Sequence, residues 1–288
     1  DTLVGDANDT TNIEGGAGAD TITGGTDAET IAGGAGADII AGGGGADTIT
    51  GGDGADVITL GGATETVDAG AGDDTVNAAG NLAFGYAIAG GAGTDILDVE
   101  AAEVIGDGSV VSGFETLQID GDLSIDLDTY SNNTFTTVVL DDSNYGTISS
   151  ARSEVFELTA VLGGAAAITL EDATGTSDSL TLRSKAADAL TQTAILTIAG
   201  TETINIVTDD TEDAGFEQDT ILLTAANTTT LNLTGDAGVV LSAGTYAALT
   251  TVDGSGATIG GVSTASTVAG ITLASDLTGV GETISYTG

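Results

Sequence analysis

The chain has 288 residues, of which 44 are Asp or Glu and only 3 are Lys or Arg, so its formal net charge at pH 7 is -41. This charge excludes a protein that binds nucleic acid, because such proteins present clustered basic side chains to the phosphates. Hydrophobic residues make up 41% of the sequence and the mean hydropathy is +0.25, which separates the chain from disordered polyanions. We therefore expect bound cations to balance the negative charge. Because the available side-chain ligands are oxygen atoms, a hard ion such as calcium is favoured.

The residue types that the sequence lacks narrow the chemistry further. It has no Cys, His, Met, Trp or Pro, so zinc, iron and copper sites, disulfides and catalysis by a Ser-His-Asp triad, a Cys-His pair or an HExxH motif are excluded. A glycosidase would need only two carboxylates, but 44 acids make any pair uninformative, and aromatic sugar platforms are scarce. No apolar run approaches the ~20 residues of a membrane span. We therefore expect a non-enzymatic protein without a transmembrane segment, and the start at Asp1 suggests part of a larger polypeptide.

A nine-residue repeat dominates the first region of the chain. Each complete copy has Gly at positions 1, 2 and 4, an acid at position 6 and an apolar residue at position 8. Intact or nearly intact copies are Gly15–Thr23, Gly33–Ala41, Gly42–Thr50, Gly51–Thr59, Ala69–Asn77 and Gly90–Asp98. Glycine lets the backbone adopt positive φ and turn its carbonyls toward a cation, and the acid adds the formal charge.

This repeat resembles the calcium-binding nonapeptide of RTX proteins. The resemblance covers about a third of the chain, which we treat as a domain of residues 1–98. It implies a parallel β-roll in which the glycine-rich half of each repeat turns and binds calcium, while the last three residues form a short strand. The alternative is a purely structural glycine-rich solenoid whose aspartates cap turns, but turn capping does not require three glycines at fixed positions.

In such a roll two repeats complete one turn, so residues 18 positions apart stack on the same flank. One flank carries only aspartate at position 6, and the other carries two glutamates and one aspartate. We therefore expect three good calcium sites between successive aspartates of the first flank and weaker sites on the second, around Asp47. The candidate calcium ligands are Asp20, Asp38, Asp56, Asp74, Asp95, Glu29, Asp47 and Glu65, with the turn glycines Gly16, Gly18, Gly34, Gly36, Gly52, Gly54, Gly70 and Gly72.

The second domain, residues 99–288, alternates apolar residues with Thr, Ser, Asn or Asp at a period of two, as in Thr203–Val207. This pattern predicts half-buried β-strands. The low aromatic content and the absence of a linker after the roll favour a Thr-rich, right-handed parallel β-solenoid. A β-sandwich is the alternative. The predicted fold class is therefore all-β throughout.

Three stretches, Gly113–Leu117, Gly200–Ile204 and Leu249–Gly256, resemble RTX-containing bacterial surface-layer proteins of the Caulobacter type. This resemblance implies a secreted structural protein that assembles by self-association into a calcium-dependent lattice on the cell surface, after export by a type I system. The alternative is a calcium-folded RTX module of a secreted adhesin, toxin or enzyme.

The second domain also contains acidic and basic residues that are candidate binding sites. The acidic pair Asp141 and Asp142 and the cluster Asp209–Asp213 could bind calcium, but without a glycine pattern they fit solvated loops better. Arg152, Arg183 and Lys185 could contact lipopolysaccharide or a cell-surface polysaccharide. Isolated bases on an acidic surface more often form local ion pairs, which is the interpretation that we prefer.

Overall fold

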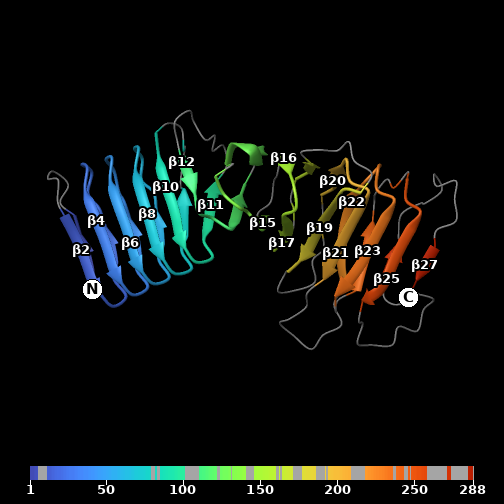
Figure 1. Cartoon of the computed structure of the whole chain (residues 1–288), viewed down its shortest axis with the longest axis horizontal. Coiled ribbons are helices and arrows are strands. Elements are labelled where there is room, and N and C mark those ends of the chain that lie inside the picture. The colour runs from blue at the N-terminus through green and yellow to red at the C-terminus, as the bar shows by residue number, and fades with distance from the viewer. Residues whose placement is uncertain are drawn as a thin grey trace. The chain divides into compact units, whose positions relative to one another are not determined.

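The computed structural model shows an all-β parallel β-solenoid (Figure 1). The described residues are 1–5, 12–78, 82, 85–100, 110–121, 124–130, 132–140, 146–159, 162, 164–170, 177–185, 192, 194–208, 218–235, 238–242, 246, 248–257, 271–273 and 285–287. The chain divides into two compact units, residues 1–120 with 128–136, and residues 121–127 with 137–288. The acidic residues 141–142 and 209–213 lie outside the described part of the chain.

The first unit stacks short strands into two parallel sheets. Strands β1, β3, β5, β7, β9, β11 and β13 follow one another in one sheet, and β2, β4, β6, β8, β10 and β12 in the other. Their bounds are β1 Thr2–Val4, β2 Asn12–Ala17, β3 Thr21–Thr23, β4 Thr30–Ala35, β5 Ile39–Ala41, β6 Thr48–Asp53, β7 Val57–Thr59, β8 Thr66–Ala71, β9 Thr75–Ala78, β10 Ala87–Ala92, β11 Ile96–Glu100, β12 Val110–Ser112 and β13 Thr116–Asp120.

The second unit follows the same plan, with strands of two to seven residues. One sheet takes β15, β17, β19, β21, β23, β25 and β27, and the other takes β14, β16, β18, β20, β22, β24 and β26. Their bounds are β14 Ile125–Asp126, β15 Thr137–Leu140, β16 Thr147–Ala151, β17 Val155–Leu158, β18 Ala166–Leu170, β19 Ser179–Ser184, β20 Leu196–Ala199, β21 Thr203–Thr208, β22 Gln218–Thr224, β23 Thr230–Gly235, β24 Gly238–Ser242, β25 Thr251–Ala257, β26 Ile271–Leu273 and β27 Ser285–Thr287. A short 3-10 helix, η1, covers Leu127–Tyr130.

Every strand pairing that the structure describes is parallel. This confirms the predicted solenoid for the second region, because a sandwich is built from antiparallel strands. In the roll Thr30 pairs with Thr48 and Ile31 with Ile49, so two nonapeptides make one coil as predicted. Within the described residues, no helix is long and apolar enough to cross a membrane.

The core of the roll is built from the apolar residue at position 8 of each repeat. These side chains are at most 2% exposed, and they are Ile22, Ile31, Ile40, Ile49, Ile58, Val67 and Val76. Each strand contributes one such residue because successive side chains point to opposite faces. A single repeat therefore buries too little apolar surface to be stable, and neighbouring coils must supply the rest of the core.

The nine-residue repeat resumes after a stretch of sequence that follows β9 and lacks the repeat pattern. Three additional residues separate Asp74 from Asp95, which lie 21 positions apart instead of 18. The pairing of β10 with β8 nevertheless keeps Ile88 opposite Val67 and Gly91 opposite Gly70. The copy Gly90–Asp98 therefore stacks in register on the earlier repeats, and all repeats up to residue 98 lie in the first unit.

Strand β5 offers a matched test of this core. Ile40 is fully buried, whereas its neighbour Ile39 is 56% exposed. We expect Ile40→Ala to lower the free energy of unfolding by about 2–5 kcal/mol through lost packing and cavity formation, and Ile39→Ala by less than about 1 kcal/mol. Urea unfolding of both variants in saturating calcium measures the difference. Equal losses would contradict a core made of position-8 side chains.

Candidate calcium sites

Aspartates of the first flank form a continuous hydrogen-bonded column, which we call the aspartate ladder. It consists of Asp20, Asp38, Asp56, Asp74 and Asp95, each placed directly before a strand of the odd-numbered sheet. The backbone N–H of each residue donates to Oδ1 of the next, at 2.8 Å for the first three steps and 2.9 Å for the step from Asp74 to Asp95. One oxygen of each carboxylate therefore holds two coils in register.

The second oxygen of each ladder carboxylate has no such role. Oδ2 of all five residues is buried and accepts no hydrogen bond from the described part of the chain. The side chains themselves are at most 3% exposed. Burying a carboxylate oxygen without a partner is costly, and a bound cation is the usual compensation. This row of unpartnered oxygens fits a series of calcium ions.

Glycine at position 1 of the intact repeats lets two oxygen atoms approach the backbone closely. A Cβ atom placed on Gly33 would lie 2.4 Å from Asp38 Oδ2 and 2.6 Å from the carbonyl oxygen of Gly51 in the next coil. On Gly51 it would lie 2.5 Å from Asp56 Oδ2 and 2.2 Å from the carbonyl oxygen of Ala69. A carboxylate oxygen and a carbonyl oxygen of the next coil thus lie close together beside each of these glycines, and oxygens of these two kinds are the ligands that calcium prefers.

Glycines at positions 2 and 4 are required for a different reason. Gly34 and Gly36 have φ values of 115° and 127°. A Cβ atom on Gly34 would lie 2.0 Å from the carbonyl oxygen of Gly16, and on Gly36 2.4 Å from that of Gly18. Both the backbone conformation and the close stacking of the turns therefore exclude larger residues.

The opposite flank uses its acids differently. Glu29 N donates to Asp47 Oδ1 at 2.8 Å, as in the ladder. Each glutamate, however, also folds back on its own turn: Glu29 Oε2 accepts from Gly25 N at 3.1 Å, and Glu65 Oε1 accepts from Gly61 N at 2.6 Å. Glu29 Oε1, Asp47 Oδ2 and Glu65 Oε2 are buried without a hydrogen-bond partner among the described residues. The extra methylene of glutamate thus diverts one oxygen to the local backbone, while another remains available.

Burial disfavours the charged form of several acids on both flanks. It raises the pKa of Asp56, Asp74 and Asp95 above the ordinary value, and the neighbouring carboxylates raise it further. Burial likewise raises the pKa of Asp47 and Glu29, and that of Glu65 to about 7. The charged form of these side chains therefore needs a positive charge nearby.

No group of three or more acidic side chains converges on one point anywhere in the described ranges. An ion held on these flanks would take the rest of its oxygen coordination from backbone carbonyls or water. Carbonyl coordination is the role that we expect of the glycine turns.

Two members of the column were missed at the sequence level. The backbone nitrogen of Asp1 donates to Asp20 Oδ1, so Asp1 precedes the ladder. At the other end Glu115 Oε2 accepts from Asp95 N at 2.9 Å. The signal was present, because Asp1, Asp20 and Glu115 each precede a Thr and then an apolar residue.

A related column continues in the second unit, with changing chemistry. Asp178 N donates to Glu202 Oε2 at 3.0 Å, as an acid of the ladder would. The next two members are threonines, and their hydroxyls donate instead: Thr229 Oγ1 to Glu202 O at 3.2 Å, and Thr250 Oγ1 to Thr229 O at 3.1 Å. These later coils are joined by neutral hydrogen bonds and place no carboxylate at those two positions.

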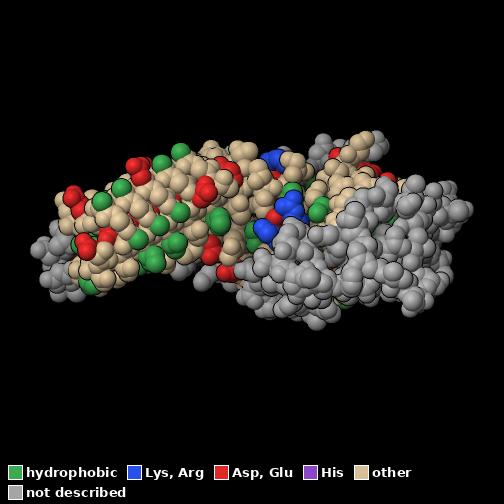
Figure 2. Space-filling view, turned by 90° about the horizontal axis from the view of Figure 1, so that it is seen from below, with side chains coloured by type: hydrophobic (Ala, Val, Ile, Leu, Met, Phe, Trp, Pro, Cys, Tyr) green, Lys and Arg blue, Asp and Glu red, His purple; other side chains and the backbone are tan. Residues whose placement is uncertain are grey.

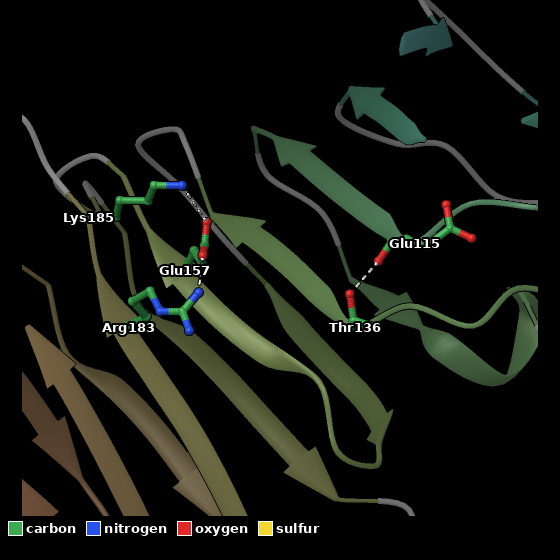
Figure 3. Close-up of polar contacts among 5 residues, drawn as sticks. All are labelled: Glu115, Thr136, Glu157, Arg183 and Lys185. Atoms are coloured by element: carbon green, nitrogen blue, oxygen red, sulfur yellow. Dashed lines mark hydrogen bonds and ion pairs between the residues drawn. The ribbon is translucent and has the colours of Figure 1, made fainter. Parts of the chain in front are cut away.

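Two of the three basic residues form a local ion pair network (Figure 3). Arg183 Nη1 lies 2.6 Å from Glu157 Oε1, and Lys185 Nζ lies 3.8 Å from Glu157 Oε2. This confirms for Arg183 and Lys185 the local pairing that we preferred over polysaccharide binding. In the space-filling view, acidic side chains far outnumber basic ones (Figure 2).

Comparison with known families agrees with the geometry of the roll. The family described as RTX calcium-binding nonapeptide repeat (4 copies) matches residues 5–40 and 41–76, a quarter of the chain. No curated protein matches the chain. The chain thus carries RTX calcium-binding repeats. They imply calcium binding, are typical of secreted proteins, and form a structural, non-catalytic kind of domain.

The turn glycines allow a test of whether glycine is required only where the turns stack closely. We expect Gly34→Ala to destabilise the calcium-loaded protein by at least about 1–2 kcal/mol, because the new Cβ meets both a positive φ and the Gly16 carbonyl. Gly62 has no described atom within 4 Å of its Cβ position, so Gly62→Ala is the matched control and should have little effect. Thermal unfolding in calcium compares them, and identical midpoints would argue against the stacked-turn geometry.

Proposed function

We propose that this chain is a structural segment of a secreted, calcium-dependent bacterial surface-layer protein that folds and self-associates when it binds calcium. The observation that carries the proposal is the row of buried ladder oxygens without hydrogen-bond partners. The matched repeats support calcium as the ion. The structural role is supported by the absence of His and Cys and by the regular solenoid of the second unit.

The ladder acids and turn carbonyls would hold the ions. The carboxylate ligands would be Asp20, Asp38, Asp56, Asp74 and Asp95, and the stacked turns would contribute carbonyls such as those of Gly33 and Gly51, which lie beside the free oxygens of Asp20 and Asp38. Glu29, Asp47 and Glu65 would form weaker sites, because both glutamates also bond to their own turns. Calcium supplies the positive charge that these buried acids lack.

The expected free energy of calcium binding is large enough to decide whether the roll folds. A site with a dissociation constant of ~0.1 mM stabilises the fold by ~1.4 kcal/mol in ~1 mM calcium. Three such sites would contribute about 4 kcal/mol, which is comparable to the whole stability of a small domain. Without calcium the stacked carboxylates would repel one another at one strand spacing.

The outer face of the second unit supports lateral assembly. Asn232 Nδ2 donates to Asn205 Oδ1 at 2.8 Å, and Asn205 Nδ2 lies 3.5 Å from Thr181 Oγ1, so polar side chains form an ordered row across β19, β21 and β23. A regularly spaced row of polar side chains of this kind would suit repeated contacts between copies. The alternative function is a calcium-folded module of a secreted adhesin, toxin or enzyme, which the matched repeats would serve equally well.

The calcium sites can be tested on the turn of Asp56. Asp56 is 1% exposed and Asp53 is exposed on the same turn, so Asn substitutions at the two positions remove the same charge. We expect Asp56→Asn to shift calcium-induced folding to higher calcium, with a loss of about 1.4 kcal/mol at 1 mM. Asp53→Asn should change stability by less than about 0.5 kcal/mol.

Circular dichroism during a calcium titration measures both effects. Excess chelator should unfold residues 1–98 of the unsubstituted protein. A spectrum that chelator leaves unchanged would refute the calcium-dependent roll.

The surface-layer role predicts a further property of the full-length protein. Addition of millimolar calcium should produce ordered two-dimensional sheets visible by negative-stain electron microscopy, and chelator should dissolve them. A soluble, calcium-bound monomer under the same conditions would instead support the appended module of a secreted protein.

A further inference from the structure

The odd-numbered sheet of the first unit exposes two large aliphatic side chains side by side. Ile39 of β5 is 56% exposed and Val57 of β7 is 37% exposed. The two residues are register partners in the parallel pairing of β5 with β7, so only one strand spacing of about 4.8 Å separates them. Val4 of β1, on the same sheet, is 75% exposed. Three of the five large hydrophobic side chains that are exposed in the described residues therefore lie on this sheet.

The exposed pair departs from the pattern of the repeat itself. Position 7, directly before the core residue, is threonine in five of the seven successive copies between residues 15 and 77, and the two exceptions are Ile39 and Val57. On the opposite sheet the same position holds a continuous row of threonines, Thr30, Thr48 and Thr66. Threonine and β-branched aliphatic residues both suit a strand. Strand formation therefore does not explain why the two exceptions fall on adjacent coils of one sheet.

The outer surface around the exposed pair carries no charge. Outward residues of β1, β3, β5, β7 and β9 alternate with inward-facing core residues, and none of them is acidic or basic. We call this surface the uncharged face. It ends at β11, where Asp98 is the first outward acid. The opposite sheet has exposed acids on its outer face, Glu14 in β2 and Asp68 in β8. The two sheets of the roll therefore differ in charge as well as in exposed apolar side chains.

The net charge of the chain favours this face for contact between two copies. The formal charge is -41, with 44 acids against 3 bases. Two copies that met through acidic surfaces would repel each other, and the bases are too few to offer matching positive charge. Arg183 and Lys185 are already paired with Glu157. The uncharged face lets two copies approach without desolvating a carboxylate of either one.

We propose that two calcium-loaded copies of this chain associate through the uncharged face, with Ile39 and Val57 of one copy packed against Val57 and Ile39 of the other. A two-fold contact of this kind is self-complementary, because the same two residues serve both copies. Two sheets that pack face to face lie about 10 Å apart, which lets the aliphatic side chains interdigitate. This inference rests on the proposed self-association and assigns one surface to it.

The size of the uncharged face sets the strength that we expect of the contact. Five strands at a spacing of about 4.8 Å, each about 10 Å long, cover on the order of 250 Å². Each partner of a standard protein interface contributes about 800 Å². The contact is therefore weak for an isolated pair, and it fills at high protein concentration or where many copies are held side by side, as in a lattice.

Sedimentation equilibrium of the chain in saturating calcium tests the contact with two matched double variants. Ile39→Asp with Val57→Asp adds two charges to the uncharged face, and we expect the dissociation constant for self-association to rise at least tenfold. Thr30→Asp with Thr48→Asp adds the same two charges at exposed, paired positions of the opposite sheet and should change it less than about twofold. Equal weakening in both variants would overturn the contact.

Two further readouts keep this test separate from folding. The calcium midpoint of circular dichroism should be the same in both double variants. Ile39→Thr with Val57→Thr restores the common residue of the repeat, so it preserves the fold, and it should still weaken self-association about tenfold. A threonine variant that associates as tightly as the unsubstituted chain would overturn the role of the aliphatic pair.

Cross-linking separates the contact from the proposed surface-layer role. The chain has no cysteine, so Val57→Cys introduces a single thiol. A short bifunctional maleimide should link two Val57→Cys chains in calcium, whereas Thr48→Cys chains should stay unlinked. Calcium-induced sheets without this link would overturn the contact and leave the surface-layer role standing. Linked pairs without sheets would support the contact and count against the surface layer.

The dependence on salt distinguishes an uncharged contact from calcium bridges between acids. Sodium chloride screens the repulsion between two acidic copies, so association through the uncharged face should strengthen between 0.05 and 0.5 M salt, roughly the range over which screening becomes strong. Association that salt abolishes would indicate ionic bridges and would overturn the proposed face.

Discussion

A carboxylate that serves two coils at once is the interaction on which the first unit depends. One oxygen of each ladder aspartate accepts the backbone N–H of the preceding coil, and the other lies buried beside the carbonyls of the following turn. The first contact sets the register of the two coils. The second oxygen carries buried negative charge that needs a positive charge nearby, and the chain has only three basic residues to supply one. If calcium meets this need as proposed, folding and cation binding would be coupled in this part of the chain.

The glycine pattern follows from that arrangement. Turns that stack at strand spacing bring the carbonyl of Gly16 within 2.0 Å of where a side chain on Gly34 would begin. The hydrophobic contribution of each nonapeptide is small, because its short strand supplies few core residues, as Ile40 does in β5. Bound ions would add to a core of this size the stability that larger domains gain from packing. The second unit shows the other solution, in which Thr229 and Thr250 join coils through hydroxyl groups.

Much of the roll could be predicted from the sequence, because a strict repeat fixes coil length, inward face and stacking partner together. The two flanks, with Asp38 on one and Asp47 on the other, follow directly from the spacing. The place of Glu115 in the column had a weaker signal, the acid-Thr-apolar order that it shares with Asp20. Its turn lacks the glycine pattern, so the strand pairing was needed to establish that place. The different hydrogen bonding of Glu29 was also hidden, because it arises from one methylene of side-chain reach. In the second region the alternation indicated strands, but only the parallel pairing excludes the sandwich.

The hydrogen bonds of the ladder all point the same way along the chain. Each amide finds its carboxylate in the coil that follows it in sequence, from Asp20 to Asp38 and finally from Asp95 to Glu115. The column is therefore polar: in every described step the amide belongs to the earlier coil and the carboxylate to the later one, so the two ends of the column are chemically different.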